Sequence, residues 1–134
     1  MKKILIVGGM VLLFTFVVLI SCATVPVKPV TQADLPDLKG KWKGFYESRG
    51  GTYTQAVELE ISNEQLNGSW TWNHANRSPD TFPFYGKIEN GRIVNSWPSG
   101  QVNLSLRRGE GKMKLEGNYQ IEGYQGTMYL DKVK

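Results

Sequence analysis

From Leu38 to the C-terminus, apolar and polar side chains alternate along the chain. Val57, Leu59 and Ile61 alternate with Glu58 and Glu60, and the same pattern runs through residues 101–108 and 112–122. Alternation of this kind is typical of antiparallel strands that have one face in the core and the other in water. No stretch of adequate length has the apolar stripe of a helix. The pattern therefore predicts an all-β domain.

Turn residues divide this region into eight expected strands. Asn90-Gly91 is the strongest turn signal, because both residues tolerate the positive φ angles of a type I′ hairpin. The expected strands are 40–48, 53–62, 65–73, 82–89, 92–97, 101–108, 112–122 and 124–132. The connection from Asn73 to Thr81 is long and polar and is expected to be a loop. Eight short antiparallel strands fit an up-and-down barrel, with a two-sheet sandwich as the alternative.

A bulky residue followed two positions later by glycine recurs along the expected strands. The triplets are Trp42-Lys43-Gly44, Leu66-Asn67-Gly68, Phe84-Tyr85-Gly86, Leu115-Glu116-Gly117 and Tyr124-Gln125-Gly126. Residues two apart share a face of a strand, so each glycine is expected on the inner face beside its bulky neighbour. Inward glycines let strands coil sharply, as closure of a small barrel requires. The triplets favour the barrel over the sandwich.

The first 22 residues have a different pattern. Lys2 and Lys3 precede an uncharged, mostly apolar run from Ile4 to Ile20, and Ser21 and Cys22 follow it. Leu19-Ile20-Ser21-Cys22 resembles the lipobox of bacterial lipoproteins. The resemblance implies that residues 1–21 are a signal peptide and that Cys22 carries a covalent lipid, the only attached group we expect. An uncleaved membrane helix and an ordinary signal peptide are the alternatives.

Residues 22–37 contain three prolines and no aromatic residue, and they are expected to form a flexible linker between the lipid and a domain at 38–134. Lipoproteins with aspartate after the cysteine are retained in the inner membrane of enteric-type Gram-negative bacteria. Ala23 stands at that position here. By this resemblance, the protein is expected on the outer membrane, facing the periplasm, if the organism is Gram-negative.

The charge of the chain gives little support to nucleic-acid binding. The net charge of +4 falls to +2 when Lys2 and Lys3 leave with the leader, and the remaining charges are largely dispersed. Charged side chains such as Glu58, Glu60 and Lys112 on the wet faces also exclude a barrel that spans an outer membrane.

Gly40-Lys41-Trp42, at the start of the first expected strand, resembles the calycin group of lipocalins, fatty-acid-binding proteins and avidins. The resemblance implies a barrel that opens at one end onto a pocket for a small molecule. The usual lipocalin also has an arginine on its last strand that packs over this tryptophan, whereas residues 124–134 contain no arginine.

No catalytic or metal-binding set of residues is apparent. His74 is the only histidine and is expected to be exposed in the loop, and Cys22 is the only cysteine. A metal site needs several converging ligands, and a nucleophile needs a base to activate it. Glu58 and Glu60 share a wet strand face, where carboxylates usually serve solubility. We therefore expect a protein that is not an enzyme and has no metal.

The aromatic residues suggest two competing functions. Five inward rings are the candidate ligand-binding residues: Trp42, Trp70, Trp72, Phe84 and Tyr119. They predict an envelope lipoprotein that binds a small hydrophobic or amphipathic ligand inside the barrel, although the same rings can simply fill the core. The alternative is a protein-interaction or enzyme-inhibitor module that binds an envelope partner through outward aromatic residues, with Phe45, Tyr85 and Tyr129 as the candidate surface.

Overall fold

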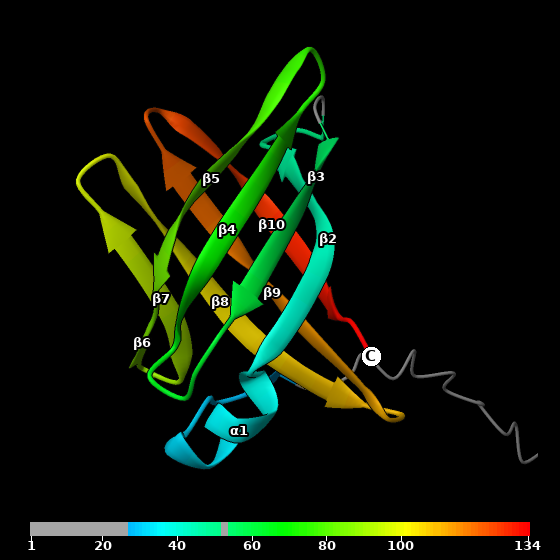
Figure 1. Cartoon of the computed structure of the whole chain (residues 1–134), viewed down its shortest axis with the longest axis vertical. Helices are drawn as coiled ribbons and strands as arrows, with labels where there is room; N and C mark the ends of the chain where they lie inside the picture. Colours follow the sequence, from blue (N-terminus) through cyan, green and yellow to red (C-terminus); the bar gives the residue numbers. More distant parts are fainter. Residues whose placement is uncertain (1–26, 52–53) are drawn as a thin grey trace, which may run out of the picture.

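The computed structural model describes residues 27–51 and 54–134, and the expected signal peptide and Cys22 lie outside them. Within the described residues the chain forms ten strands and two short helices (Figure 1). The strands are β1 (Val27–Lys28), β2 (Gly40–Ser48), β3 (Thr54–Ile61), β4 (Asn67–His74), β5 (Arg77–Tyr85), β6 (Lys87–Glu89), β7 (Arg92–Trp97), β8 (Gly100–Gly109), β9 (Lys112–Ile121) and β10 (Tyr124–Lys132). A 3-10 helix, η1 (Gln32–Asp34), continues into the single turn α1 (Leu35–Leu38).

All strand pairs are antiparallel, and the main sheet has the order β5-β4-β3-β2-β10-β9-β8-β7-β6. Each pair of neighbours in this order is also consecutive in sequence, except β10 and β2, and β1 pairs with β8 beside this order. The pairing of β10 with β2 runs from Gly126 opposite Ser48 to Lys132 opposite Trp42 and joins the last long strand to the first. The sheet therefore curls into a half-barrel (Figure 1), which confirms the predicted all-β antiparallel class.

The two ends of this sheet, β5 and β6, follow each other along the chain without pairing in the described residues. We call the boundary between β5 and the β6–β7 hairpin the seam. The expected strand 82–89 is interrupted at Gly86, whose backbone N–H donates to the Leu66 carbonyl at 2.8 Å. This break and the added strand β1 explain why the structure has ten strands where the sequence predicted eight.

The polar segment 73–81, predicted to be a loop, is mostly strand. β4 and β5 continue to His74 and Arg77, so the hairpin is longer than expected. Trp72 pairs with Asp80 and His74 pairs with Arg77, with a register shift between the two pairs. Past the core, side chains on both faces meet water, and the alternation that marks a strand is lost.

Four glycines of the repeated triplets allow the close strand contacts that were expected of them: Gly44, Gly68, Gly117 and Gly126. A Cβ atom at any of these positions would lie 1.7 or 1.8 Å from a carbonyl oxygen of the neighbouring strand. Such a distance is far inside van der Waals contact, so a side chain cannot be accommodated without moving the backbone. These positions let the sheet curl as tightly as it does.

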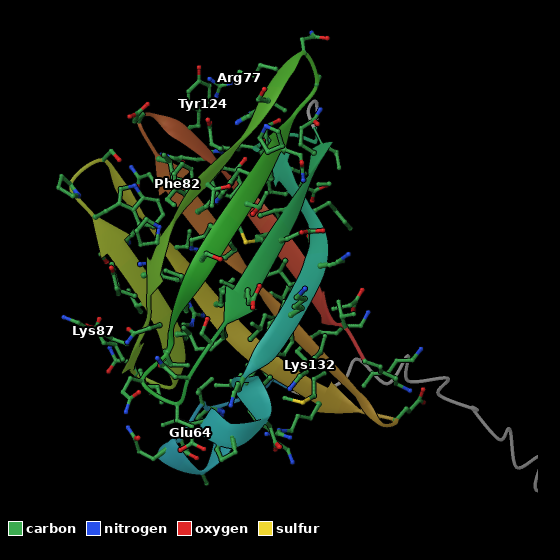
Figure 2. All side chains as sticks on the ribbon, viewed as in Figure 1. Glu64, Arg77, Phe82, Lys87, Tyr124 and Lys132 are labelled. Atoms are coloured by element: carbon green, nitrogen blue, oxygen red, sulfur yellow. The ribbon has the colours of Figure 1, made fainter. Side chains whose placement is uncertain are left out.

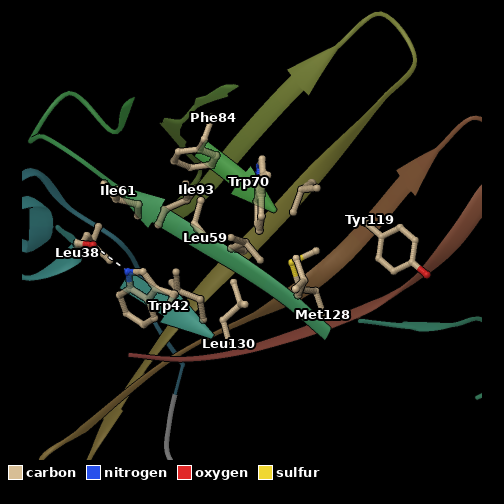
Figure 3. Packing of buried hydrophobic residues seen from close by; sticks show 14 of the residues in the cluster. Leu38, Trp42, Leu59, Ile61, Trp70, Phe84, Ile93, Tyr119, Met128 and Leu130 are labelled. Atoms are coloured by element: carbon tan, nitrogen blue, oxygen red, sulfur yellow. Dashed lines mark hydrogen bonds between the residues drawn. The ribbon is translucent and has the colours of Figure 1, made fainter. Parts of the chain in front are cut away.

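The inner face holds one connected apolar core, in which Trp42, Trp70 and Phe84 are fully buried (Figure 3). One end of the half-barrel is covered by α1, and we call it the α1 end (Figure 1). There Leu38 is fully buried, and its carbonyl accepts a hydrogen bond of 2.9 Å from Nε1 of Trp42. Arg108 of β8 ties the segment down through ion pairs with Asp34 at 2.8 Å and Asp37 at 3.0 Å.

The flexible linker predicted for residues 22–37 is therefore wrong for the part that the structure describes. Residues 27–37 form β1, η1 and most of α1, and Val30 is buried. The backbone N–H of Val30 donates to the Gly91 carbonyl at 2.8 Å, and β1 pairs with β8. The segment is attached to the core by three apolar residues, Val30, Leu35 and Leu38. Their spacing in the sequence follows neither the period of a strand nor that of a helix.

Candidate functional site

The best candidate site is an aromatic cluster near the end of the half-barrel opposite α1, which we call the distal end. Trp72 lies at its centre. The centroid of the Trp72 ring is 4.7 Å from that of Tyr46, 5.6 Å from Tyr119, 5.8 Å from Trp70 and 6.5 Å from Phe82. Trp70 in turn meets Phe84 edge to face at 5.5 Å. Strands β2, β4, β5 and β9 thus contribute to one continuous aromatic surface.

The cluster is positioned by strand backbones. Tyr119 lies across Gly126, where a Cβ would come within 2.5 Å of its hydroxyl oxygen. The Tyr119 hydroxyl donates to the Glu47 carbonyl at 3.2 Å, and the Tyr46 hydroxyl donates to the Asn73 carbonyl at 3.1 Å. Both tyrosines bury an apolar ring and satisfy the polar tip at a strand end, which holds the rings in fixed orientations.

Trp72 differs from the other two buried tryptophans in its polar group. Nε1 of Trp42 donates to Leu38, and Nε1 of Trp70 donates to the side chain of Asn95 at 2.9 Å. Trp72 is only 5% exposed, and its Nε1 is buried. This atom has no hydrogen-bond partner in the described part of the chain. An unsatisfied buried donor costs about 1–3 kcal/mol. An acceptor group brought to this atom would recover that cost.

Two rings at the distal end are exposed to solvent. Phe82 is 38% exposed and Tyr124 is 74% exposed. Figure 2 shows both on the far side of the half-barrel from Glu64, which lies beside α1. Trp97 and Ile121 are partly buried and pack against the core. The aromatic cluster therefore reaches solvent through Phe82.

A charged group stands at the tip of the β4–β5 hairpin, beside this surface. Nε2 of His74 lies 2.7 Å from Oδ2 of Asp80, and Nη2 of Arg77 lies 3.0 Å from the same oxygen. The His74 side chain is 19% exposed, so the expectation of a freely exposed loop histidine is wrong. Within residues 27–51 and 54–134, no three His, Cys, Asp or Glu side chains are arranged to hold a metal ion.

The structure separates the five residues predicted to line a pocket. All five point inward and are buried, as expected. Trp70, Trp72, Phe84 and Tyr119 belong to the aromatic cluster, whereas Trp42 lies at the α1 end against Leu38. Trp42, Trp70 and Phe84 are fully buried and act as core. Trp72 and Tyr119 are the members of the set that remain close to solvent.

The residues predicted as an interaction surface do not form one patch. Phe45 and Tyr129 are paired across β2 and β10, with ring centroids 5.0 Å apart on the outer face. Tyr85 is 63% exposed at the end of β5, on the other side of β3 and β4 from this pair. Trp97, a further aromatic residue at the end of β7, packs against the core on the same side of the strand as buried Ile93 and Asn95.

Sequence reasoning missed two polar residues with structural roles. Asn95 is 2% exposed and crosses the seam: its Oδ1 accepts from Trp70, and its Nδ2 donates to the Tyr85 carbonyl at 3.1 Å. Lys132 of β10 places its Nζ 5.6 Å from the centre of the Trp42 ring and donates to the Asp37 carbonyl. A polar residue at an inward strand position is the signal that could have identified Asn95.

In the part of the chain that the structure describes, no helix has the length and apolar character needed to cross a membrane. Comparison with protein-family models, curated proteins and solved structures finds no match to this chain.

Proposed function

We propose that this protein is a lipid-anchored lipoprotein of a bacterial cell envelope. Its β domain binds a small amphipathic molecule at the distal end, without catalysing a reaction on it. The observation that carries this proposal is Nε1 of Trp72, a buried donor without a partner. It lies within an aromatic surface that reaches solvent through Phe82. A ligand with one acceptor group and an apolar body suits such a surface.

The packed core limits how far this ligand can enter. Trp70 and Phe84 fill the half-barrel below Trp72, and Leu38 and Trp42 fill the α1 end. The ligand therefore sits at the distal end rather than in a deep central cavity. Its acceptor group meets Nε1 of Trp72, and its apolar part contacts the rings of Trp72 and Phe82.

A calycin-like barrel is the fold that we propose for this domain. The pairing of β10 with β2 brings the last long strand against the first, as closure of an up-and-down barrel requires. Lys132 lies over Trp42 at 5.6 Å, where the lipocalin pattern has an arginine on the last strand. In both the Lys132–Trp42 pair and the lipocalin arginine–tryptophan pair, the cation is attracted to the face of the tryptophan ring.

The lipid anchor assigns an orientation to this domain. Val27, where β1 begins, is five positions after Cys22. Five residues span at most about 18 Å, so the domain lies close to the membrane. β1 pairs with Leu106 and Arg107, next to the Arg108 that binds η1 and α1. The anchor therefore leaves from the α1 end, and the ligand site at the distal end faces the aqueous space.

Metabolic labelling tests the anchor. Cells that express the full chain are grown with radiolabelled palmitate, and Cys22→Ser is the matched variant. We expect label on the wild-type protein and none on Cys22→Ser, which should also fail to mature. An unlabelled wild-type protein, or a Cys22→Ser variant that matures and stays on the membrane, would contradict the anchor.

Replacement of Trp72 by phenylalanine tests the ligand site. The full chain is placed in phospholipid nanodiscs, and dodecanoate binding is followed by tryptophan fluorescence. Trp72→Phe keeps a ring but removes the unpartnered N–H, so we expect unchanged folding and roughly three- to tenfold weaker binding. Trp97→Phe is the matched control and should bind like the wild type. Absence of dodecanoate binding, together with absence of a co-purifying ligand in native mass spectrometry, would refute the proposal.

A further inference from the structure

The outer face of β2, β8, β9 and β10 is divided into two chemically different halves. Toward the α1 end its side chains form ion pairs with one another. Arg107 meets Glu116 at 2.7 Å, Lys114 meets Asp131 at 3.5 Å, and Lys43 on β2 meets Glu58 at 3.3 Å. These six charged side chains are paired with one another within the protein.

Toward the distal end the same face is uncharged on three adjacent strands. Two rows of side chains cross β8, β9 and β10 in register: Gln101, Gln120 and Gln125 form one row, and Asn103, Asn118 and Thr127 form the other. Side chains directly opposite each other on neighbouring strands lie about 5 Å apart. The two rows therefore form a compact set, which we call the amide patch.

The amide groups of this patch are unused within the described protein. None of the five Gln and Asn side chains makes a hydrogen bond to another group in residues 27–51 and 54–134. Gln101, Asn118, Gln120 and Gln125 are exposed, and Asn103 and Thr127 are half-buried. Each amide offers two donors and one acceptor oxygen. Many donors and acceptors are thus displayed side by side with no net charge.

The surface at the amide patch is hollowed. A cleft of about 490 Å³ lies over the patch and extends to the end of β2, where Glu47 and Arg49 contribute to its lining. This volume falls within the range of about 300–1,000 Å³ that is usual for sites that bind small molecules. The cleft reaches the aromatic cluster at Tyr119, but Trp72 does not line it.

An aromatic pair borders the cleft on the same outer face. Tyr129 follows Thr127 by two positions on β10, and Phe45 precedes Glu47 by two positions on β2. Their ring centroids are 5.0 Å apart, and Phe45 is 42% exposed. The Tyr129 hydroxyl donates to Oε1 of Glu47 at 3.3 Å, which ties the pair to the rim of the cleft.

We propose that this cleft binds a neutral glycan. Sugar hydroxyls are both donors and acceptors, and uncharged amides satisfy both roles without the desolvation cost of a charge. The rings of Phe45 and Tyr129 offer an apolar surface for a sugar face. The two rows carry no charge, and Arg49 and Glu47 add one charge of each sign to the rest of the lining, so the cleft favours a neutral ligand over an anionic one. A peptide strand does not fit, because β9 and β10 are paired on both sides here and have no free edge.

Titration calorimetry with neutral tetrasaccharides tests the proposal on the full chain in a detergent that contains no sugar. The probes are chitotetraose, cellotetraose and maltotetraose, which differ in N-acetylation and linkage. We expect at least one to bind, and Asn118→Ala combined with Gln120→Ala to weaken that binding by about tenfold or more. Gln65→Ala, an exposed amide outside the cleft, is the matched control and should bind like the wild type.

Each other result overturns the proposal. These results are absence of binding by all three probes, equal weakening by Gln65→Ala, and full binding by the double variant. A dimer that the double variant abolishes would show that the patch pairs with a second copy of the chain instead. Trp72→Phe should leave glycan binding unchanged, so failure here and failure of the ligand site at the distal end can be told apart.

Discussion

Asn95 is the residue that holds the seam together. It is 2% exposed, and its amide bonds to the Trp70 indole on β4 and the Tyr85 carbonyl on β5. No ladder joins β5 to β6 or β7 in the described chain, so this side chain replaces strand pairing at that boundary. A buried polar group that satisfies two others is costly to remove, because both partners are left unpaired.

Asn95→Leu keeps a similar volume and removes both hydrogen bonds. We expect a loss of about 2–4 kcal/mol in the free energy of unfolding, measured by urea denaturation. Trp70→Phe should lower the free energy of unfolding less in the Asn95→Leu background than in the wild type. In that background the Asn95 side chain, which accepts the hydrogen bond from Trp70, is already absent. Ser96→Ala, on the outer face next to Asn95, is the control and should change stability by less than about 0.5 kcal/mol. A loss for Asn95→Leu as small as that of the control would contradict this role.

Asp34 links the stability of the α1 end to pH. The backbone N–H of Thr31 donates to its carboxylate at 2.8 Å, and this bond, together with Arg108, outweighs burial and lowers the pKa of Asp34 below its ordinary value of 3.8. A carboxyl with a lowered pKa in the folded state adds stability at neutral pH. That contribution is lost as the pH falls from about 3.8 through the folded pKa.

Asp34→Asn should therefore destabilise the protein at neutral pH, and the difference from wild type should shrink as the solution is acidified below pH 3.8. Urea unfolding at a series of pH values measures both effects. Asp131→Asn, at a carboxylate that is 70% exposed and 3.5 Å from Lys114, is the comparison and should have little effect. A difference between wild type and Asp34→Asn that stays constant with pH would show that the carboxylate charge does not contribute.

At the scale of elements, glycines serve two distinct purposes. Gly117 lies inside β9, where a Cβ would be 1.7 Å from the Asn103 carbonyl oxygen. Gly123 lies in the β9–β10 turn with a φ of 82°, and a Cβ there would meet nothing within 4 Å. The first position needs glycine for close approach, and the second needs it for backbone conformation.

Alanine at these two glycines separates the two effects. Gly123→Ala should cost about 1 kcal/mol, the usual penalty for a side chain at positive φ. Gly117→Ala should cost about 3 kcal/mol or more, because β8 and β9 must move apart to admit the methyl group. Thermal unfolding by circular dichroism compares the two variants. Equal losses would show that close strand contact does not determine the curl of the sheet.

The sequence predicted those elements that have one face in the core and one in water. In β3 and β9 the alternation is nearly complete, and both strands were located to within about a residue. The β4–β5 hairpin was missed between Asn73 and Thr81, because the strands there leave the core and their side chains are mostly polar. β1 and α1 were missed because so short a segment is ordered by tertiary contacts alone.

The same limit applies to the candidate site. Alternation was enough to place Trp72 and Tyr119 on the inner face, because the face of each residue follows from the pattern within its own strand. Their meeting across β4 and β9, and the unpartnered Nε1 of Trp72, depend on how the sheet curls. The amide patch was likewise invisible in the sequence, because its rows cross three strands and exist only in the paired register.

At the scale of the whole molecule, the half-barrel is closed unequally on its two sides. β10 and β2 are joined by a ladder from Gly126 opposite Ser48 to Lys132 opposite Trp42. Across the seam, Asn95 supplies the hydrogen bonds between β7 and the β4–β5 pair. The aromatic surface at the distal end includes Phe82 of β5, one of the strands at the seam. Opening of the seam would therefore widen the proposed ligand site without disturbing the core strands.

Hydrogen–deuterium exchange on the full chain measures this asymmetry. We expect amides of β5 and β6 to exchange faster than those of β2 and β10, because local opening at the seam breaks fewer hydrogen bonds than global unfolding. If the ligand binds at the distal end, dodecanoate should slow exchange in β5 and leave β10 unchanged, since contact with Phe82 favours the closed seam. Equal protection of β5 and β10 in the free protein would show that the seam is as stable as the β10–β2 ladder. In that case ligand entry has to occur through the end of the half-barrel rather than along its side.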